Sequence, residues 1–289
     1  MTPLRIDAHM HVWDLAVRDQ PWTAGDLAPL HRTFSLDDTA GERGRAGVDG
    51  VVLVQTLAVP EETPELLMLA EANPVVAGVV GWVDLTADDV GEQLQRLRAG
   101  PFGDRLVGIR HLVQGESDPR WLCRPDVRRG LSAVADAGLV YDLLILPHQL
   151  PAAEETAAAL PELRFVVDHL AKPPIASGEI EPWATGMRAL AALPNVTCKL
   201  SGMVTEADWS NWTTDHLRPY AELVIDAFGA DRVLFGSDWP VCTLAAGYRE
   251  VVDAAEELVT ALSAAEREAV FGGTARAAYG LSPAASTSR

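Results

Sequence analysis

The sequence predicts an α/β fold, a single-domain (β/α)8 barrel, from two observations. Short apolar runs rich in valine, isoleucine and leucine recur along the chain with helical segments between them, which is typical of parallel strands buried on both faces. The chain has 289 residues and is 48% hydrophobic. A barrel of alternating strands and helices uses this length as one domain and needs a core of that size.

Eight apolar runs predict eight strands, and eight parallel strands favour closure into a barrel. We expect them at about residues 4–9, 50–56, 76–83, 106–112, 139–146, 164–169, 196–201 and 232–237. Apolar residues at helical spacing predict helices at residues 62–72, 88–99, 126–137, 152–159 and 220–228.

Local signals mark where helices begin and end. Ser35 and Thr86 are each followed three residues later by an aspartate, as helix N-caps are, while Gly138 and Gly229 lie where helices are expected to stop. The segment from Trp13 to Phe34 is long for a loop, so we expect it to fold over the barrel mouth and shape a pocket. The domain boundaries that follow are a barrel at residues 1–281 and a small, polar, flexible tail at residues 282–289.

The composition excludes some classes of partner. A formal net charge of −18 and a sequence pI of about 4.7 make binding to nucleic acid electrostatically unfavourable. Three widely spaced cysteines, Cys123, Cys198 and Cys242, suit a reducing cytoplasm and lack the pairing of a zinc knuckle. No apolar signal core or run of 18 apolar residues is present, so we expect neither export nor a membrane span. Oligomeric state stays open, with a homo-oligomer allowed.

Polar residues gather where the expected strands end, which is where barrels of this kind carry their active sites. His9 and His11 are two apart on the first strand and therefore point to the same side. Asp238 ends the last strand, and closure makes the first and last strands neighbours. The sequence therefore predicts that two imidazoles and a carboxylate converge on one ion or one reacting atom.

Other strand ends supply further candidates. We expect His169 and His111 to act in catalysis with Asp238, and we expect substrate to be bound by Arg110, Lys172, Lys199, Trp13, Trp239 and Asp84. Only two of the 23 basic residues are lysines, and both follow expected strands, which favours a role for each.

Structural explanations stand beside these functional ones. The histidines can be core residues with satisfied hydrogen bonds, Asp238 a helix cap, and the tryptophans packing residues. Asp168 should alternate to the side opposite His169, so that only one of the two faces the mouth. The two lysines can also be ordinary surface residues.

Several motifs in one order resemble the amidohydrolase superfamily, in particular its L-fuconolactonase and L-rhamnonolactonase branch. The resemblance covers about residues 4–280 and rests on Ile6-Asp7-Ala8-His9-Met10-His11, Gly108-Ile109-Arg110-His111, Asp168-His169-Leu170-Ala171-Lys172-Pro173, Cys198-Lys199-Leu200-Ser201-Gly202 and Gly236-Ser237-Asp238-Trp239-Pro240-Val241-Cys242.

The resemblance implies a distorted (β/α)8 TIM barrel and hydrolysis of a sugar-acid lactone to the open acid. It matches Asp238 to the aspartate that takes the proton of water, and His9, His11 and His169 to the histidines of strands one and six. Many members carry a carboxylated lysine on strand four that bridges two metals, but this chain has Arg110-His111 there. We therefore expect either no required metal or a single divalent ion, with zinc favoured, at His9, His11 and Asp238.

Lactone hydrolysis needs a deprotonated water and a stabilised oxyanion. We expect Asp238 to act as base, His111, Lys172 or an ion to stabilise the oxyanion, and His169 to orient water or protonate the leaving alkoxide. Arg110, Lys172 and Lys199 would hold the oxygen atoms of the anionic product. Two alternatives remain open: a mononuclear metal-dependent decarboxylase of the same fold, and a sugar-acid binding protein without turnover.

Overall fold

The structure is a computed structural model that describes residues 4–281. Within this range eight parallel strands pair in sequence order, which confirms the predicted barrel. They are β1 (Ile6–Met10), β2 (Gly50–Val54), β3 (Val76–Gly81), β4 (Leu106–His111), β5 (Val140–Leu143), β6 (Arg164–Val167), β7 (Val196–Leu200) and β8 (Val233–Phe235).

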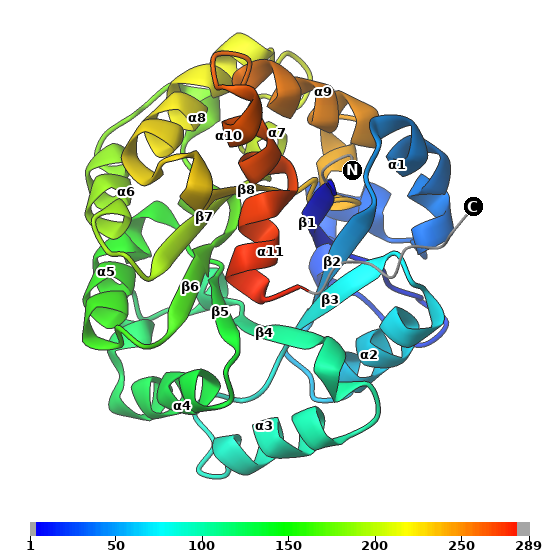
Figure 1. Ribbon diagram of the computed structural model, residues 1–289, viewed down its shortest axis with the longest axis vertical. Coiled ribbons are helices and arrows are strands. Elements are labelled where there is room, and N and C mark those ends of the chain that lie inside the picture. Colours follow the sequence, from blue (N-terminus) through cyan, green and yellow to red (C-terminus); the bar gives the residue numbers. More distant parts are fainter. Residues whose placement is uncertain (1–3, 282–289) are drawn as a thin grey trace.

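Helices surround the strands in a ring (Figure 1). They are α1 (Ala40–Ala46), α2 (Glu62–Ala72), α3 (Val90–Ala99), α4 (Pro125–Asp136), α5 (Leu150–Ala159), α6 (Trp183–Ala191), α7 (Met203–Glu206), α8 (Thr214–Phe228), α9 (Tyr248–Leu258), α10 (Ala264–Glu268) and α11 (Thr274–Tyr279). The five predicted helices correspond to α2, α3, α4, α5 and α8. The last begins earlier than predicted, because the helix tolerates Pro219 in its second turn.

The strands are buried on both faces, as their unbroken apolar runs predict. On β2, Val51 and Leu53 pack outward in the large core beneath the helices, while Val52 and Val54 pack inside the barrel. The inner cluster also contains side chains of α11 (Ala275, Ala278 and Tyr279). Figure 1 shows α11 in the middle of the ring, so this helix closes one end of the barrel.

The barrel closes between its first and last strands through a few backbone contacts. The Asp238 amide donates to the carbonyl oxygen of His9 at 2.9 Å, and the His11 amide donates to that of Trp239 at 2.7 Å. Asp7 reinforces this seam, because its buried carboxylate accepts hydrogen bonds from the Ser237 amide at 2.8 Å and the Tyr248 hydroxyl at 3.1 Å. The seam places the residues that follow β8 beside β1.

Most of the predicted local signals are confirmed. Ser35 starts a short 3-10 helix (Leu36–Thr39) and its amide donates to Asp38, while Gly138 and Gly229 end helices with left-handed φ angles of 71° and 79°. The predicted cap at Thr86 is wrong: α3 begins after Asp89, because Thr86 instead belongs to a turn bonded to Asp84. The predicted tail at residues 282–289 lies outside the described residues. None of the helices in residues 4–281 has the length and apolar character needed to cross a membrane.

The long segment after β1 is an ordered cover, as predicted. It contains 3-10 helices at Pro21–Thr23 and Gly25–Leu30. Its two ends pair as an isolated antiparallel bridge between Trp13 and Phe34, and the Trp13 indole donates to the carbonyl oxygen of Arg32 at 2.6 Å.

Candidate functional site

Four side chains from three separate parts of the chain meet where β1, β6 and β8 end. The Nε2 atoms of His9 and His11 are 3.1 Å apart. Asp238 Oδ1 lies 3.4 Å from His11 Nε2, 3.7 Å from His9 Nε2 and 3.8 Å from His169 Nε2. The predicted convergence of two imidazoles and a carboxylate is therefore present, and a third imidazole joins it.

The backbone turns Asp238 inward after β8. Asp238 has a left-handed φ of 57°, a conformation that costs an L-residue about 1–2 kcal/mol and is held here by the seam between β1 and β8. Gly236 makes the close approach possible, because a Cβ atom at this position would lie 2.7 Å from His9 Cβ. The sequence Gly-Ser-Asp that follows β8 thus carries the carboxylate to the histidines.

A second unusual turn presents His169 after β6. The four residues from His169 to Lys172 all have left-handed φ angles between 51° and 54°. The turn is held by the Trp183 indole, which donates to the carbonyl oxygen of Leu170 at 2.6 Å. The strand is shorter than predicted, because the chain leaves it at Val167 to make this turn.

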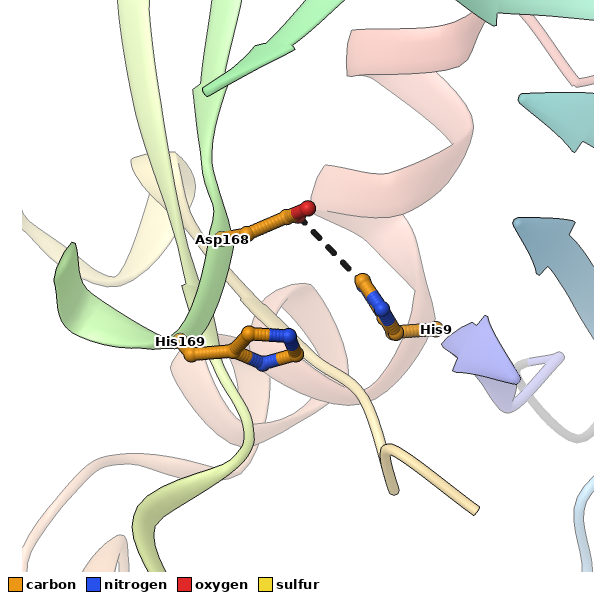
Figure 2. Close-up of side chains that lie close together, drawn as sticks. All are labelled: His9, Asp168 and His169. Carbon is orange, nitrogen blue, oxygen red and sulfur yellow. Dashed lines mark ion pairs between the residues drawn. The ribbon is translucent and has the colours of Figure 1, made fainter. Parts of the chain in front are cut away.

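Both Asp168 and His169 contact His9, although only His169 lines the pocket described below. Figure 2 shows His9 pointing from β1 toward both of them. The His9 and His169 ring centroids are 4.4 Å apart, and Asp168 Oδ1 lies 3.4 Å from His9 Nδ1. Simple strand alternation predicts that only one residue faces the mouth, and the left-handed turn is the reason that the other still reaches His9.

A network of buried charges lies beneath these groups. Lys199 donates to Asp142 at 2.6 Å and lies 2.8 Å from Asp168, which also pairs with Arg110 at 3.1 Å. Tyr279 of α11 donates to the Asp142 carboxylate at 2.8 Å. Lys199 is fully buried and contacts protein groups below the pocket, whereas it was expected at the substrate. Its position within β7 directs its side chain into the barrel interior.

Burial and neighbouring charges set the protonation states. Burial lowers the pKa of His169 to about 4 and lowers that of His9 well below its ordinary value, where the Lys199 ammonium acts in the same direction. Burial alone would raise the pKa of Asp238, but the nearby His169, His11 and His9 outweigh it and hold that pKa below its ordinary value. Near neutral pH the site therefore contains an ionised Asp238 beside neutral His9 and His169.

A pocket of about 320 Å³ opens above the cluster. His11, Arg110, His169, Lys172 and Asp238 line it, as does the covering segment through Trp22 and Leu27. Sequence reasoning missed other lining residues that follow β2, β4, β5, β7 and β8: Thr56, Leu112, Gln114, Leu144, Thr205, Glu206, Trp209, Val241 and Leu244. Several of these residues directly follow strands, and that position in the sequence could have identified them as candidates. Glu206 pairs with Lys172 at 3.0 Å, so a hydrogen-bond acceptor and a donor lie side by side in the pocket wall.

Besides His9 and Lys199, which lie below it, four expected site residues do not line this pocket. His111 stacks on Trp121 with ring centroids 4.4 Å apart and pairs with Glu116 at 2.8 Å, and Asp84 accepts from the Thr86 hydroxyl at 2.7 Å. Trp13 and Trp239 are buried and both pack against Phe34, so they support the covering segment.

The site can hold one divalent ion. His11 Nδ1 lies 2.7 Å from the carbonyl oxygen of Val54, which can only accept, so Nδ1 carries the proton and Nε2 offers its lone pair. His9, His11 and Asp238 provide the nitrogen and oxygen donors that zinc takes, close enough to share one ion. Arg110 and His111 occupy the end of β4, so that strand offers no lysine to bridge a second ion.

Comparisons with known proteins agree with this geometry. The family model described as amidohydrolase matches residues 6–281. The chain is 43% identical to an L-fucono-1,5-lactonase of Burkholderia ambifaria over 83% of this chain and 82% of that protein. It is 39% identical to an L-fucono-1,5-lactonase of Burkholderia multivorans over 97% of each.

A solved structure extends the similarity to three dimensions. A crystal structure of an amidohydrolase from Burkholderia multivorans with bound zinc is 38% identical and superimposes with a TM-score of 0.90, covering 96% of this chain and 100% of that one. The barrel, the buried cluster of histidines and aspartates and the family match together lead to one conclusion: the chain belongs to the amidohydrolase family.

Proposed function

We propose that this protein hydrolyses a sugar-acid lactone of the L-fucono-1,5-lactone type to the open acid. The observation that carries the proposal is the ionised Asp238 at the pocket floor, within 4 Å of three imidazoles. The two lactonases that are 43% and 39% identical to the chain support the substrate class.

Asp238 acts as the base in this proposal. A water in the pocket beside Asp238 gives up a proton as its oxygen attacks the ester carbonyl carbon. The lowered pKa keeps the Asp238 carboxylate ionised over a wide range of pH. A positioned general base contributes about 10²- to 10⁴-fold to the rate.

His169 moves the proton to the leaving oxygen. Its Nδ1 lies 2.8 Å from the Ser201 hydroxyl, and donation by that hydroxyl leaves the proton on Nε2, which is turned toward Asp238. When the ring C–O bond breaks, Nε2–H protonates the alkoxide as Asp238 returns the proton taken from water to the same nitrogen, so the imidazole stays neutral. The products are the hydroxy acid and the unchanged enzyme.

Arg110 and Lys172 stabilise negative charge on the substrate. Arg110 lines the pocket, so its guanidinium is the donor that would stabilise the carbonyl oxygen as it becomes an oxyanion. A preorganised donor of this kind is worth about 3 kcal/mol in the transition state. Lys172 with Glu206 offers a donor and an acceptor to the hydroxyl groups of a sugar acid.

A divalent ion held by His9, His11 and Asp238 would polarise the carbonyl and lower the pKa of a bound water. We expect the reaction to proceed without it, because Arg110 already supplies a cation next to His9, with Nη1 3.3 Å from His9 Nε2. Exhaustive chelation followed by elemental analysis and assay tests this expectation. Retained turnover supports it, and complete loss that zinc restores would contradict it.

The proposed function is tested by a panel of aldonolactones, with acid release followed by a pH indicator. We expect L-fucono-1,5-lactone to be among the best substrates. Absence of hydrolysis across the panel would contradict the proposal, and release of carbon dioxide from an unsaturated or aromatic acid would favour a decarboxylase instead.

A further inference from the structure

We propose that Lys199 is a positioning residue that fixes His9 in the tautomer with its proton on Nε2. In that tautomer His9 donates a hydrogen bond from Nε2 beneath the pocket, and a metal ion can bind His9 Nε2 only after the ring proton moves to Nδ1. The inference concerns the His9 ring itself, so its direct test does not depend on the substrate.

In the contact between Lys199 and His9, Lys199 can only be the hydrogen-bond donor. An ammonium group has three donors and no acceptor. One of these donors bonds Asp142 Oδ2 at 2.6 Å and another bonds His9 Nδ1 at 3.0 Å, while Asp168 Oδ1 lies 2.8 Å from the ammonium as an ion pair. His9 Nδ1 must then accept, and a neutral imidazole that accepts at Nδ1 carries its proton on Nε2.

The contacts of the other ring nitrogen, His9 Nε2, favour the same tautomer. His11 donates from Nδ1 to the Val54 carbonyl oxygen at 2.7 Å, so His11 Nε2 is an acceptor. His9 Nε2 lies 3.1 Å from it. Two lone pairs at this separation would repel, whereas a proton on His9 Nε2 makes a hydrogen bond. The chain of donors therefore runs in one direction, from Lys199 through His9 and His11 to Val54.

Two longer contacts favour the opposite tautomer. Asp168 Oδ1 lies 3.4 Å from His9 Nδ1, and Arg110 Nη1 lies 3.3 Å from His9 Nε2. Asp168 Oδ1 forms its shortest ion pair with the Lys199 ammonium at 2.8 Å, and Arg110 Nη1 donates to Asp168 Oδ2 at 3.1 Å. Because the two shorter contacts agree with each other and require the proton on Nε2, we infer that this tautomer is the stable one.

Lys199 is held in place from below. Asp142 is fully buried and also accepts from the Tyr279 hydroxyl of α11. Tyr279 of α11 therefore holds the Asp142 carboxylate in place, and Asp142 in turn holds Lys199. Histidines that bind metals usually donate their second nitrogen to a carboxylate or carbonyl, and here the nearest group to that nitrogen is an ammonium.

Nitrogen-15 NMR of the metal-free wild-type protein is the direct test. Long-range correlation spectra distinguish a protonated from an unprotonated ring nitrogen, and loss of signals in a His9→Asn variant assigns the ring. We expect an unprotonated Nδ1 and a protonated Nε2 near neutral pH. A protonated Nδ1, alone or together with Nε2, would overturn the inference.

Zinc affinity of a Lys199→Met variant provides a second readout. Without the ammonium, His9 Nδ1–H can donate to Asp168, and the freed Nε2 becomes a ligand. We expect zinc to bind at least about tenfold more tightly than to wild type in calorimetric titrations, within the range attributed to the partners of metal ligands. Unchanged or weaker binding by a folded variant would contradict the inference. If the variant fails to fold, the wild-type spectrum still decides.

Tyr279→Phe is the matched control. It removes a hydrogen bond from the same buried network and leaves the contact of Lys199 with His9 in place. We expect unchanged zinc affinity and an unchanged His9 tautomer. A gain in affinity equal to that of Lys199→Met would show general loosening of the network, and would contradict a specific role for Lys199.

Discussion

The two sides of the barrel mouth carry similar residues in different environments. Where β6 and β8 end, His169 and Asp238 point into the pocket beside His9. Where β3 and β4 end, Asp84 and His111 bond to neighbouring loops instead. His169 and Asp238 have left-handed φ angles, and neither Asp84 nor His111 does. After β6 and β8 a left-handed turn brings the polar side chain to the site, whereas His11 and Arg110 reach the pocket from β1 and β4 without such a turn.

Of the two histidines compared, His169 is expected to show the larger effect. Replacing it with Gln removes the group that moves the proton to the leaving oxygen, so kcat for lactone hydrolysis should fall by about 10²-fold. Steady-state kinetics measures this loss. His111→Gln makes the same chemical change on the other side of the mouth, and an equal loss there would contradict the division between the two sides.

The left-handed region around His169 can be disturbed without replacing the histidine. A Cβ atom at Gly202 would lie 2.6 Å from the His169 ring, so Gly202→Ala should displace the ring and lower kcat about tenfold. Gly178→Ala is the control, because Gly178 also has a positive φ but has no atom within 4 Å of the added methyl group. Both variants should lose stability, and equal activity in the two would contradict the positioning of His169 by this contact.

The pH dependence of stability should also distinguish the two sides. The pKa of His169 is about 4 in the folded protein, below its ordinary value of 6.5, so the unfolded chain binds its proton first as the pH falls. The stabilisation is complete above about pH 6.5 and is lost on acidification toward pH 4, by about 3 kcal/mol. Urea unfolding at pH 7 and pH 4.5 should show a larger loss for wild type than for His169→Gln. Equal losses would contradict a buried, neutral His169.

The smallest effect on activity is expected on the other side of the mouth. His111→Gln removes the stacking on Trp121 and weakens the contact with Glu116, so we expect a loss of about 1 kcal/mol in stability. The value of kcat/KM should change by less than about threefold. Thermal unfolding together with steady-state kinetics checks both. A large loss of activity with unchanged stability would place His111 in the reaction.

The fold was predictable because hydrophobic patterning determines it. Runs such as Val51 to Val54 identify buried parallel strands without reference to the rest of the chain. Strand ends were less predictable. Leu144 and Ile145 stay buried although strand pairing stops at Leu143, so the apolar run continues past the end of β5.

The candidate site was predictable in its histidines and Asp238, and not in its buried charges. His9 and His11 alternate on one strand, so their shared direction follows from spacing. Lys199 is different, because its burial depends on Asp142, 57 positions away, and on Tyr279 of α11, which bonds to Asp142. Such tertiary pairing leaves no local pattern, so the sequence could not show that Lys199 lies among buried carboxylates below the pocket.

Lactone hydrolysis by Asp238→Asn, measured beside Asp84→Asn, tests most directly whether the chemistry resides where β1, β6 and β8 meet. Both variants replace a carboxylate at a strand end by an amide of the same size. With L-fucono-1,5-lactone, we expect kcat of Asp238→Asn to fall at least about 10²-fold in a folded protein, and that of Asp84→Asn to stay within about threefold. Full turnover by folded Asp238→Asn, or equal losses in both variants, would contradict this assignment.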